Sequence, residues 1–247
     1  MVISPRLLES RMRPILAAIR TAPLPHRGDE PSTPAPQRVA LPFVTISRQA
    51  GVGAWSLAGR LARRLNELQP GEPPWSSFDR ELVEKVAADH HLTHQLIESL
   101  EASSHSWLAD FWSGLSFADK KEFPTETTVF RQVAATLRAL AQIGRVVIVG
   151  RGGVYITRNM TGGVHVRLIA SSAHRIATLA RRENLSEKMA ALKVRQLDQN
   201  RQAFCRHYWP NAADDPAVFD IILNTADLPV DALIDGIVPL LLAKTPT

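Results

Sequence analysis

The sequence predicts an α/β fold with three layers, in which helices cover both faces of a mostly parallel sheet. One observation is a set of short, strongly apolar segments without polar alternation, which is typical of strands buried on both faces. A second is that amphipathic segments separate these strands along the chain, an order that favours parallel strands joined by helices. The third is size, because 247 residues with 45% hydrophobic content can bury a full core.

The individual elements follow from these patterns. The segment FVTIS reads as the first buried strand, and Leu57, Leu61, Leu65 and Leu68 then share one face of a helix. Later helices have apolar residues at intervals of three or four, and Gly144 closes one of them. We expect strands at 43–47, 145–150, 164–170 and 219–225. We expect further helices at 80–91, 129–144, 172–183, 187–209 and about 230–242.

Composition narrows the class of protein. A single cysteine, Cys205, cannot form an internal disulfide, so a reducing compartment fits best and we expect a cytoplasmic location. No apolar run approaches the ~20 residues that a membrane-spanning helix needs. The net charge of +5 favours anionic partners, and the arginines are spread along the chain. Both phosphorylated small molecules and nucleic acid fit that charge.

The chain divides into three regions. Residues 1–21 have apolar side chains at helical spacing, so we expect an amphipathic helix that Pro14 kinks and that packs on the body or on a partner. Residues 22–40 are rich in proline and polar residues, which favours an extended linker. The folded domain is therefore expected to span 41–247.

The stretch TISRQAGVGAWS, at 45–56, predicts a strand, a glycine-bearing turn and then a helix. Gly51 and Gly53 let the backbone turn tightly with its N–H groups exposed. The start of the following helix adds a partial positive charge that suits phosphate. In an open parallel sheet, ligands bind outside the carboxyl ends of the strands, where this turn lies. The turn is a candidate phosphate site, although similar turns also occur for packing alone.

Other segments carry a resemblance to a known family. VVIVGRGGVYI, then VHVRLIASSAHRIATLARRE and then VRQLDQNR resemble the nucleoside-monophosphate kinases, and most closely the cytidylate kinase-like family. The resemblance extends over roughly 43–239 and includes the glycine turn and the segment FDREL. It implies a P-loop NTPase-like fold with a helical lid, ATP and Mg²⁺ as cofactors, and transfer of the γ-phosphoryl group to CMP or dCMP.

Within the turn, the resemblance implies that a run of loop residues binds the cofactor. These residues are Gly51, Val52, Gly53, Ala54, Trp55 and Ser56. Ser56 falls on the hydroxyl position that faces magnesium in P-loop kinases. Ala54 falls on the position of the Walker lysine, and Trp55 stands where the family usually has an arginine. The loop therefore keeps its amides but lacks both cations, and phosphoryl transfer would need positive charge from elsewhere.

Two arginines at strand ends are candidates for that charge. Arg48 leaves the first strand and could fold over the phosphates in bidentate fashion, or form an ion pair with the next strand. Arg151 follows a buried strand directly, where a cation is costly unless it meets an anion. The resemblance assigns Arg151 to the acceptor phosphate, with a structural ion pair as the alternative. Gly152 departs from the aspartate of true cytidylate kinases.

The remaining candidates come from the lid and from the acceptor side. The resemblance implies a catalytic lid that contains Arg175, Arg181 and Arg182. It implies substrate binding by Asp79, Arg80, Asp198 and Arg201. Lid closure expels water and supplies guanidinium donors to the phosphates. Each lid arginine alone could instead lie on a solvated helix face, and Asp79 serves equally well as an N-cap.

Three functions remain open at this point. The resemblance favours a kinase that transfers a phosphoryl group from ATP to CMP or dCMP. Ala54, Trp55 and Gly152 instead favour a nucleotide-binding, regulatory module with little or no turnover. A nucleic-acid-binding role draws on the basic composition but lacks a recognised module or an aromatic stacking platform, and is the least favoured.

Overall fold

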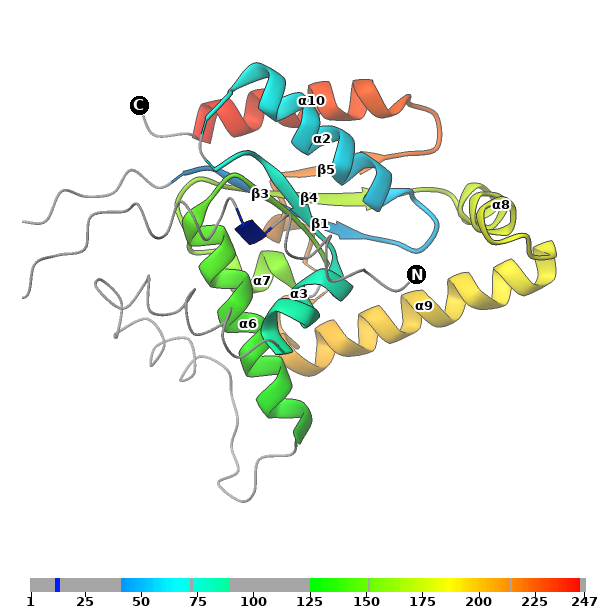
Figure 1. Cartoon of the computed structure of the whole chain (residues 1–247). Helices are drawn as coiled ribbons and strands as arrows, with labels where there is room; N and C mark the ends of the chain where they lie inside the picture. Colours follow the sequence, from blue (N-terminus) through cyan, green and yellow to red (C-terminus); the bar gives the residue numbers. More distant parts are fainter. Residues whose placement is uncertain are drawn as a thin grey trace, which may run out of the picture.

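The computed structural model describes residues 12–13, 41–71, 73–88, 125–150, 152–213 and 215–244. In these residues, a five-stranded sheet lies between two layers of helices (Figure 1). The strands are β1 (Phe43–Arg48), β2 (Ser76–Phe78), β3 (Val146–Val149), β4 (Gly163–Ile169) and β5 (Ile221–Asn224). Their order is β2-β3-β1-β4-β5, and every pairing is parallel. This arrangement confirms the predicted α/β fold with a parallel sheet covered by helices on both faces.

Helices cover both faces of the sheet. One face carries α2 (Ala54–Leu68) and α10 (Val230–Lys244), and the other carries α3 (Arg80–Ala88), α6 (Thr125–Ile143) and α7 (Gly153–Thr157). Two further helices are α8 (Ser172–Glu183), which lies beyond the carboxyl ends of the strands, and α9 (Glu187–Tyr208), which runs from there back to the side of α3 and α6 (Figure 1). We call α8 and α9 together the lid helices. A 3₁₀ turn (Pro216–Val218) precedes β5.

The first strand occupies the centre of the sheet. Val44 of β1 stands beside Val147 of β3 on one side and Val164 of β4 on the other. All three side chains are buried, as the apolar sequence of these strands predicts. The chain therefore leaves β1 at the middle of the carboxyl edge, the side of the sheet where all the strands end. Open parallel sheets bind ligands on that side.

Each face of the sheet has its own hydrophobic core. Leu57, Leu61 and Leu65 of α2 pack with α10 against β1, β3 and β4. On the other face, α3 and α6 pack around Phe78, and Met12 is 1% exposed within that same core. At least this residue of the predicted N-terminal helix therefore packs on the body of the domain. The predicted linker at 22–40 lies outside the described residues.

The leucines that share one face of α2 are not all buried. Leu57, Leu61 and Leu65 lie in the core, whereas Leu68, the last residue of the helix, is 46% exposed. The side chain of Asn66 holds the backbone of Trp75 through two hydrogen bonds, of 3.0 and 2.7 Å. Trp75 is buried in the core of this face.

The lid helices begin where the sequence predicts. The hydroxyl of Ser171 accepts a hydrogen bond from the His174 N–H at 3.3 Å, and that of Ser186 accepts one from the Met189 N–H at 3.4 Å. These N-caps fix the starts of α8 and α9. Asn184 turns the chain between them with a left-handed conformation, φ +53°. The short helix α7 was not predicted, because five residues are too few to produce a helical pattern.

Candidate functional site

The glycine turn connects β1 to α2 as predicted. Gly51 and Gly53 have φ of +82° and +73°, which glycine adopts without strain. Within the described part of the chain, no group accepts a hydrogen bond from the backbone N–H groups of Gly51, Val52, Gly53 or Ala54. A row of N–H donors at the start of a helix is the usual protein site for a phosphate or another anion.

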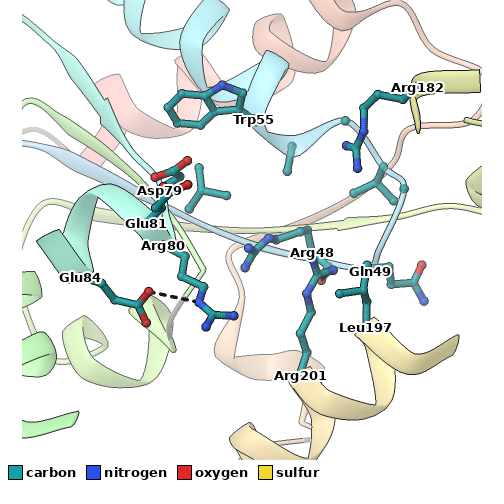
Figure 2. Close-up of a pocket in the computed structure, with 15 residues that line it drawn as sticks. Arg48, Gln49, Trp55, Asp79, Arg80, Glu81, Glu84, Arg182, Leu197 and Arg201 are labelled. Atoms are coloured by element: carbon teal, nitrogen blue, oxygen red, sulfur yellow. Dashed lines mark hydrogen bonds and ion pairs between the residues drawn. The ribbon is translucent and has the colours of Figure 1, made fainter. Parts of the chain in front are cut away.

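The turn forms one wall of a cavity of about 460 Å³ at the carboxyl edge of the sheet (Figure 2). The cavity is lined by Arg48, Gln49, Gly51, Val52, Gly53, Ala54, Trp55, Asp79, Arg80, Glu81, Glu84, Val149, Arg182, Leu197 and Arg201. The structure thus brings together ten of the residues that the sequence singled out. We call this cavity the phosphate-loop pocket.

Four arginines from four elements line this pocket. They are Arg48 of β1, Arg80 of α3, Arg182 of α8 and Arg201 of α9 (Figure 2). Burial lowers the pKa of Arg201, and the neighbouring charges of Arg182, Arg80 and Arg175 lower it further, against the opposing effect of Asp198. The positive charges are therefore close enough to repel one another, and a bound anion would relieve that repulsion.

Arg48 contacts the end of the neighbouring strand and also lines the pocket. Its guanidinium packs against the Cα of Gly150, at the end of the neighbouring strand β3, where any side chain at position 150 would collide with it. Its backbone oxygen accepts a hydrogen bond of 3.4 Å from Arg201. The side chain therefore crosses towards the end of β3 and also lines the phosphate-loop pocket.

The lid arginines separate into different environments. Arg182 lines the pocket, with its side chain 58% exposed, and also forms an ion pair of 2.8 Å with Glu183. Arg181 is exposed and does not line the pocket. Arg175 is only 11% exposed and is paired with Asp198 of α9. The sequence placed these three arginines in one lid but could not tell their environments apart.

Asp198 contacts the phosphate loop itself. Its Oδ1 accepts a hydrogen bond of 2.7 Å from the backbone N–H of Ala50, while its other oxygen pairs with Arg175. Arg201 lies 3.8 Å from the same carboxylate. Asp198 does not line the pocket, whereas Arg201 does.

Asp79 is an N-cap and also a pocket residue. Its Oδ1 accepts a hydrogen bond of 2.8 Å from the Leu82 N–H and so caps α3, and the residue also lines the pocket. Arg80 forms an exposed ion pair of 3.4 Å with Glu84, one helical turn further on. Three carboxylates therefore lie in the same pocket as the arginines, those of Asp79, Glu81 and Glu84.

Two of the expected residues are less well placed or not described. Arg151 lies outside the described residues. Ser56 is exposed in the first turn of α2 and does not line the pocket. Gly152 has φ +70°, and a side chain there would collide with the ring of Trp209. A side chain at position 152 would therefore require the Trp209 ring to move.

Sequence reasoning missed several pocket residues. They are Gln49, Glu81, Glu84, Val149 and Leu197. Gln49 bridges two strands, because its Oε1 accepts a hydrogen bond of 3.0 Å from the Ala170 N–H at the end of β4. Its position next to Arg48 at the exit of β1 was a usable signal. Glu84 could have been found from its spacing of four residues after Arg80.

The described residues contain neither a cluster of metal ligands nor a membrane-spanning helix. No group of three or more His, Cys, Asp or Glu side chains among these residues could hold a metal ion. Of the helices that the structure describes, none is both long and apolar enough to cross a membrane.

Comparison with known proteins places this site in a family. No curated protein matches the chain. An uncharacterized protein from Eubacterium ventriosum ATCC 27560 is similar in structure, with a TM-score of 0.63, 19% identity, and coverage of 82% of this chain and 98% of that one. Shikimate kinase from Bacteroides thetaiotaomicron matches with a TM-score of 0.44 and 14% identity, covering 81% of this chain and 98% of its own.

A model of the cytidylate kinase-like family matches residues 43–227, which include the glycine turn, the acceptor-side residues and both lid helices. The match covers well over half of the chain. The chain belongs to the cytidylate kinase-like family.

Proposed function

We propose that this protein binds ATP with Mg²⁺ in the phosphate-loop pocket and transfers the γ-phosphoryl group to CMP or dCMP. The proposal rests above all on one observation: the N–H groups of Gly51–Ala54 have no acceptor among the described residues, and they line a pocket with four arginines. Amides and guanidinium groups are the donors that phosphates require. Family membership supports a nucleotide as the source of those phosphates.

The residues present fit a triphosphate in spite of the missing lysine. Ala54 is buried at the start of α2 and contributes only its backbone. In our proposal, Arg48, Arg182 and Arg201 supply the positive charge that a Walker lysine gives elsewhere, and Arg151 adds to it at the acceptor phosphate. The resemblance assigns Mg²⁺ to the Ser56 hydroxyl, which is exposed and does not line the pocket, so a bound ion would reach that hydroxyl only at the rim of the pocket.

The proposed reaction needs no general base. An oxygen of the acceptor phosphate, already anionic near neutral pH, forms a bond to the γ-phosphorus of ATP. The bond from that phosphorus to the β,γ-bridging oxygen breaks, and its electron pair stays on ADP. The products are ADP and CDP or dCDP. Catalysis then consists of positioning and charge stabilisation by the loop amides and the arginines.

Ala54 and Trp55 support a second candidate, a nucleotide-binding module with little or no turnover. Neither residue places a cation inside the loop. A guanidinium that reaches the phosphates from the lid or from β1 has to be held in position by its own neighbours. A module that only binds and reports nucleotide does not need that precision.

A direct assay separates the two candidates. Purified protein is incubated with labelled ATP, Mg²⁺ and a panel of nucleoside monophosphates, and melting temperature is measured with each nucleotide. Phosphorylation of CMP or dCMP above the background of Arg151→Ala supports the kinase. A rise in melting temperature with ATP or CMP but without phosphorylation supports the binding module. If neither nucleotide changes the melting temperature, both candidates fail.

Neighbouring lid arginines provide a matched test of the pocket. Arg182→Ala removes a pocket-lining guanidinium, whereas Arg181→Ala removes an exposed one from the next position on α8. We expect Arg182→Ala to weaken ATP binding by about tenfold, since one charge-assisted hydrogen bond contributes about 1.5–3 kcal/mol. Equal losses in the two variants would contradict this placement of the pocket.

A further inference from the structure

The first half of the phosphate loop is enclosed by the lid helices. Ala50 is 1% exposed and packs with Leu179 of α8 and with Ala190 and Val194 of α9. The Cα of Gly51 lies directly against the backbone oxygen of Arg175, so that a side chain at position 51 would collide with it. The lid helices and the loop are therefore packed together at this point.

Polar contacts reinforce this packing on both sides of one peptide. The N–H of Ala50 donates to Asp198 Oδ1 at 2.7 Å. The carbonyl oxygen of Ala50 lies 3.5 Å from Arg175 Nη1, and Arg175 also pairs with the second oxygen of Asp198. The Asp198 carboxylate thus holds the N–H of Ala50, and the Arg175 guanidinium holds its carbonyl oxygen. Ala50 directly precedes the loop amides that are proposed to bind phosphate.

Neither member of this pair lines the pocket. Arg175 is largely buried and has its guanidinium directed at Asp198 and Ala50. A residue committed to such contacts would have to break them before it could reach a nucleotide. The pair is therefore better placed to shape the loop than to bind substrate.

We propose that Asp198 is a positioning residue which, together with Arg175, holds the phosphate loop in its anion-binding conformation before nucleotide arrives. This assignment differs from the substrate-binding role that the family resemblance implies for Asp198. It rests on the proposed function only in that the loop is taken to bind phosphate. A loop that is already ordered loses less conformational entropy on binding, so the pair raises affinity without touching the ligand.

The test measures the loop directly and does not require activity. Hydrogen–deuterium exchange of the peptide that covers residues 48–57 is compared, without nucleotide, in the wild type, Asp198→Ala, Asp198→Asn and the control Arg195→Ala. Arg195 is exposed on α9, three residues before Asp198, and lines no part of the pocket. Affinity for ATP with Mg²⁺ is then measured by titration calorimetry for the same variants.

We expect Asp198→Ala to speed exchange of the loop peptide by at least about tenfold, since it removes hydrogen bonds to a charged group. Asp198→Asn keeps an acceptor for the Ala50 N–H but not the charge opposite Arg175, and we expect an intermediate rate. Arg195→Ala should match the wild type. Affinity for ATP should fall in the same order as exchange rises.

Two results would overturn the proposal. One is a loop peptide that exchanges in Asp198→Ala as slowly as in the wild type. The other is faster exchange to the same degree in every peptide of the protein, which would make Asp198 a general stabilising residue. If the wild type binds no nucleotide but the loop of Asp198→Ala still exchanges faster, the proposed function fails and the positioning role stands.

Discussion

Basic residues lie at both ends of the parallel strands, but their hydrogen-bonding partners differ. We call the two ends the amino edge and the carboxyl edge of the sheet. At the amino edge, Lys244 donates to Asp220 at 2.6 Å and to the Gly163 oxygen at 3.0 Å. Arg145, also at this edge, donates to the backbone oxygen of Gln69 and lies 5.8 Å from the centre of the Trp75 ring. At the carboxyl edge, the amides of the glycine turn find no acceptor among the described residues.

This difference shows what distinguishes a ligand site from a structural network in this fold. Basic residues occur at both edges, so their presence alone does not identify the site. At the amino edge, Lys244 and Arg145 both donate to protein oxygens. At the carboxyl edge, the N–H groups of Gly51–Ala54 have no acceptor among the described residues, and such donors are what an anionic ligand requires.

The largest effect is expected from a side chain added at the carboxyl edge. Gly51→Ala should destabilise the protein by about 3 kcal/mol, because it combines a left-handed backbone with a collision against the Arg175 oxygen. It should also abolish the rise in melting temperature with ATP. Denaturant unfolding and thermal melting with and without ATP measure both effects.

Gly53→Ala is the matched control. Its backbone is also left-handed, but an added Cβ meets nothing within 4 Å. We expect a cost of only about 1 kcal/mol, from the backbone alone. If both variants lose the same stability, the close packing of the loop against α8 is wrong.

A smaller effect is expected from pH at the amino edge. His165 of β4 is 5% exposed and bonded through Nδ1 to Thr45 at 2.8 Å. Burial lowers the pKa of His165 to about 4, and the charges of Lys244 and Arg158 add to this against the opposite effect of Asp220. The unfolded chain therefore binds more protons than the folded one between about pH 6.5 and pH 4.

Stability should consequently fall as the pH falls through that range. From pH 7 to pH 5 we expect the free energy of unfolding to drop by about 2 kcal/mol through this residue. His165→Gln should remove most of that slope, as measured by urea unfolding at the two pH values. A variant that keeps the full pH dependence would show that other groups cause it.

The smallest effect should come from the exposed pair at the same edge. Lys244→Met breaks an ion pair that is partly open to solvent, for which we expect a loss below about 1 kcal/mol. The ATP-dependent change in melting temperature should be unaltered, because Lys244 lies at the opposite edge from the pocket. A weakened ATP response would mean that the two edges are coupled.

Much of the fold could be predicted because burial dictates the sequence of its strands. The apolar segment at 43–47 became β1, and the helix expected at 172–183 is α8 without change. The glycine turn was found for the same reason, since it had to follow a buried strand. The shared helix face did not reveal that Leu68, at the end of α2, is exposed, nor that Trp75, from a loop, is buried in the same core.

The candidate site was harder to predict in detail. Arg175 and Arg182 lie two turns apart on one helix, and nothing in their spacing distinguishes a guanidinium that pairs with Asp198 from one that lines the pocket. That distinction depends on α9, which is a separate element. The network that Asp198 forms with Ala50 joins residues 148 positions apart. Local patterns carry no information about such contacts.

The contact between Gly152 and Trp209 constrains how this protein could have diverged. An aspartate introduced at position 152 alone would collide with the indole, and a smaller residue introduced at 209 alone would open a hole beside Tyr155, which stacks on that ring at 4.7 Å. Either substitution alone is therefore expected to destabilise the protein. A side chain can therefore be introduced at position 152 only if position 209 changes with it, or through a less stable intermediate.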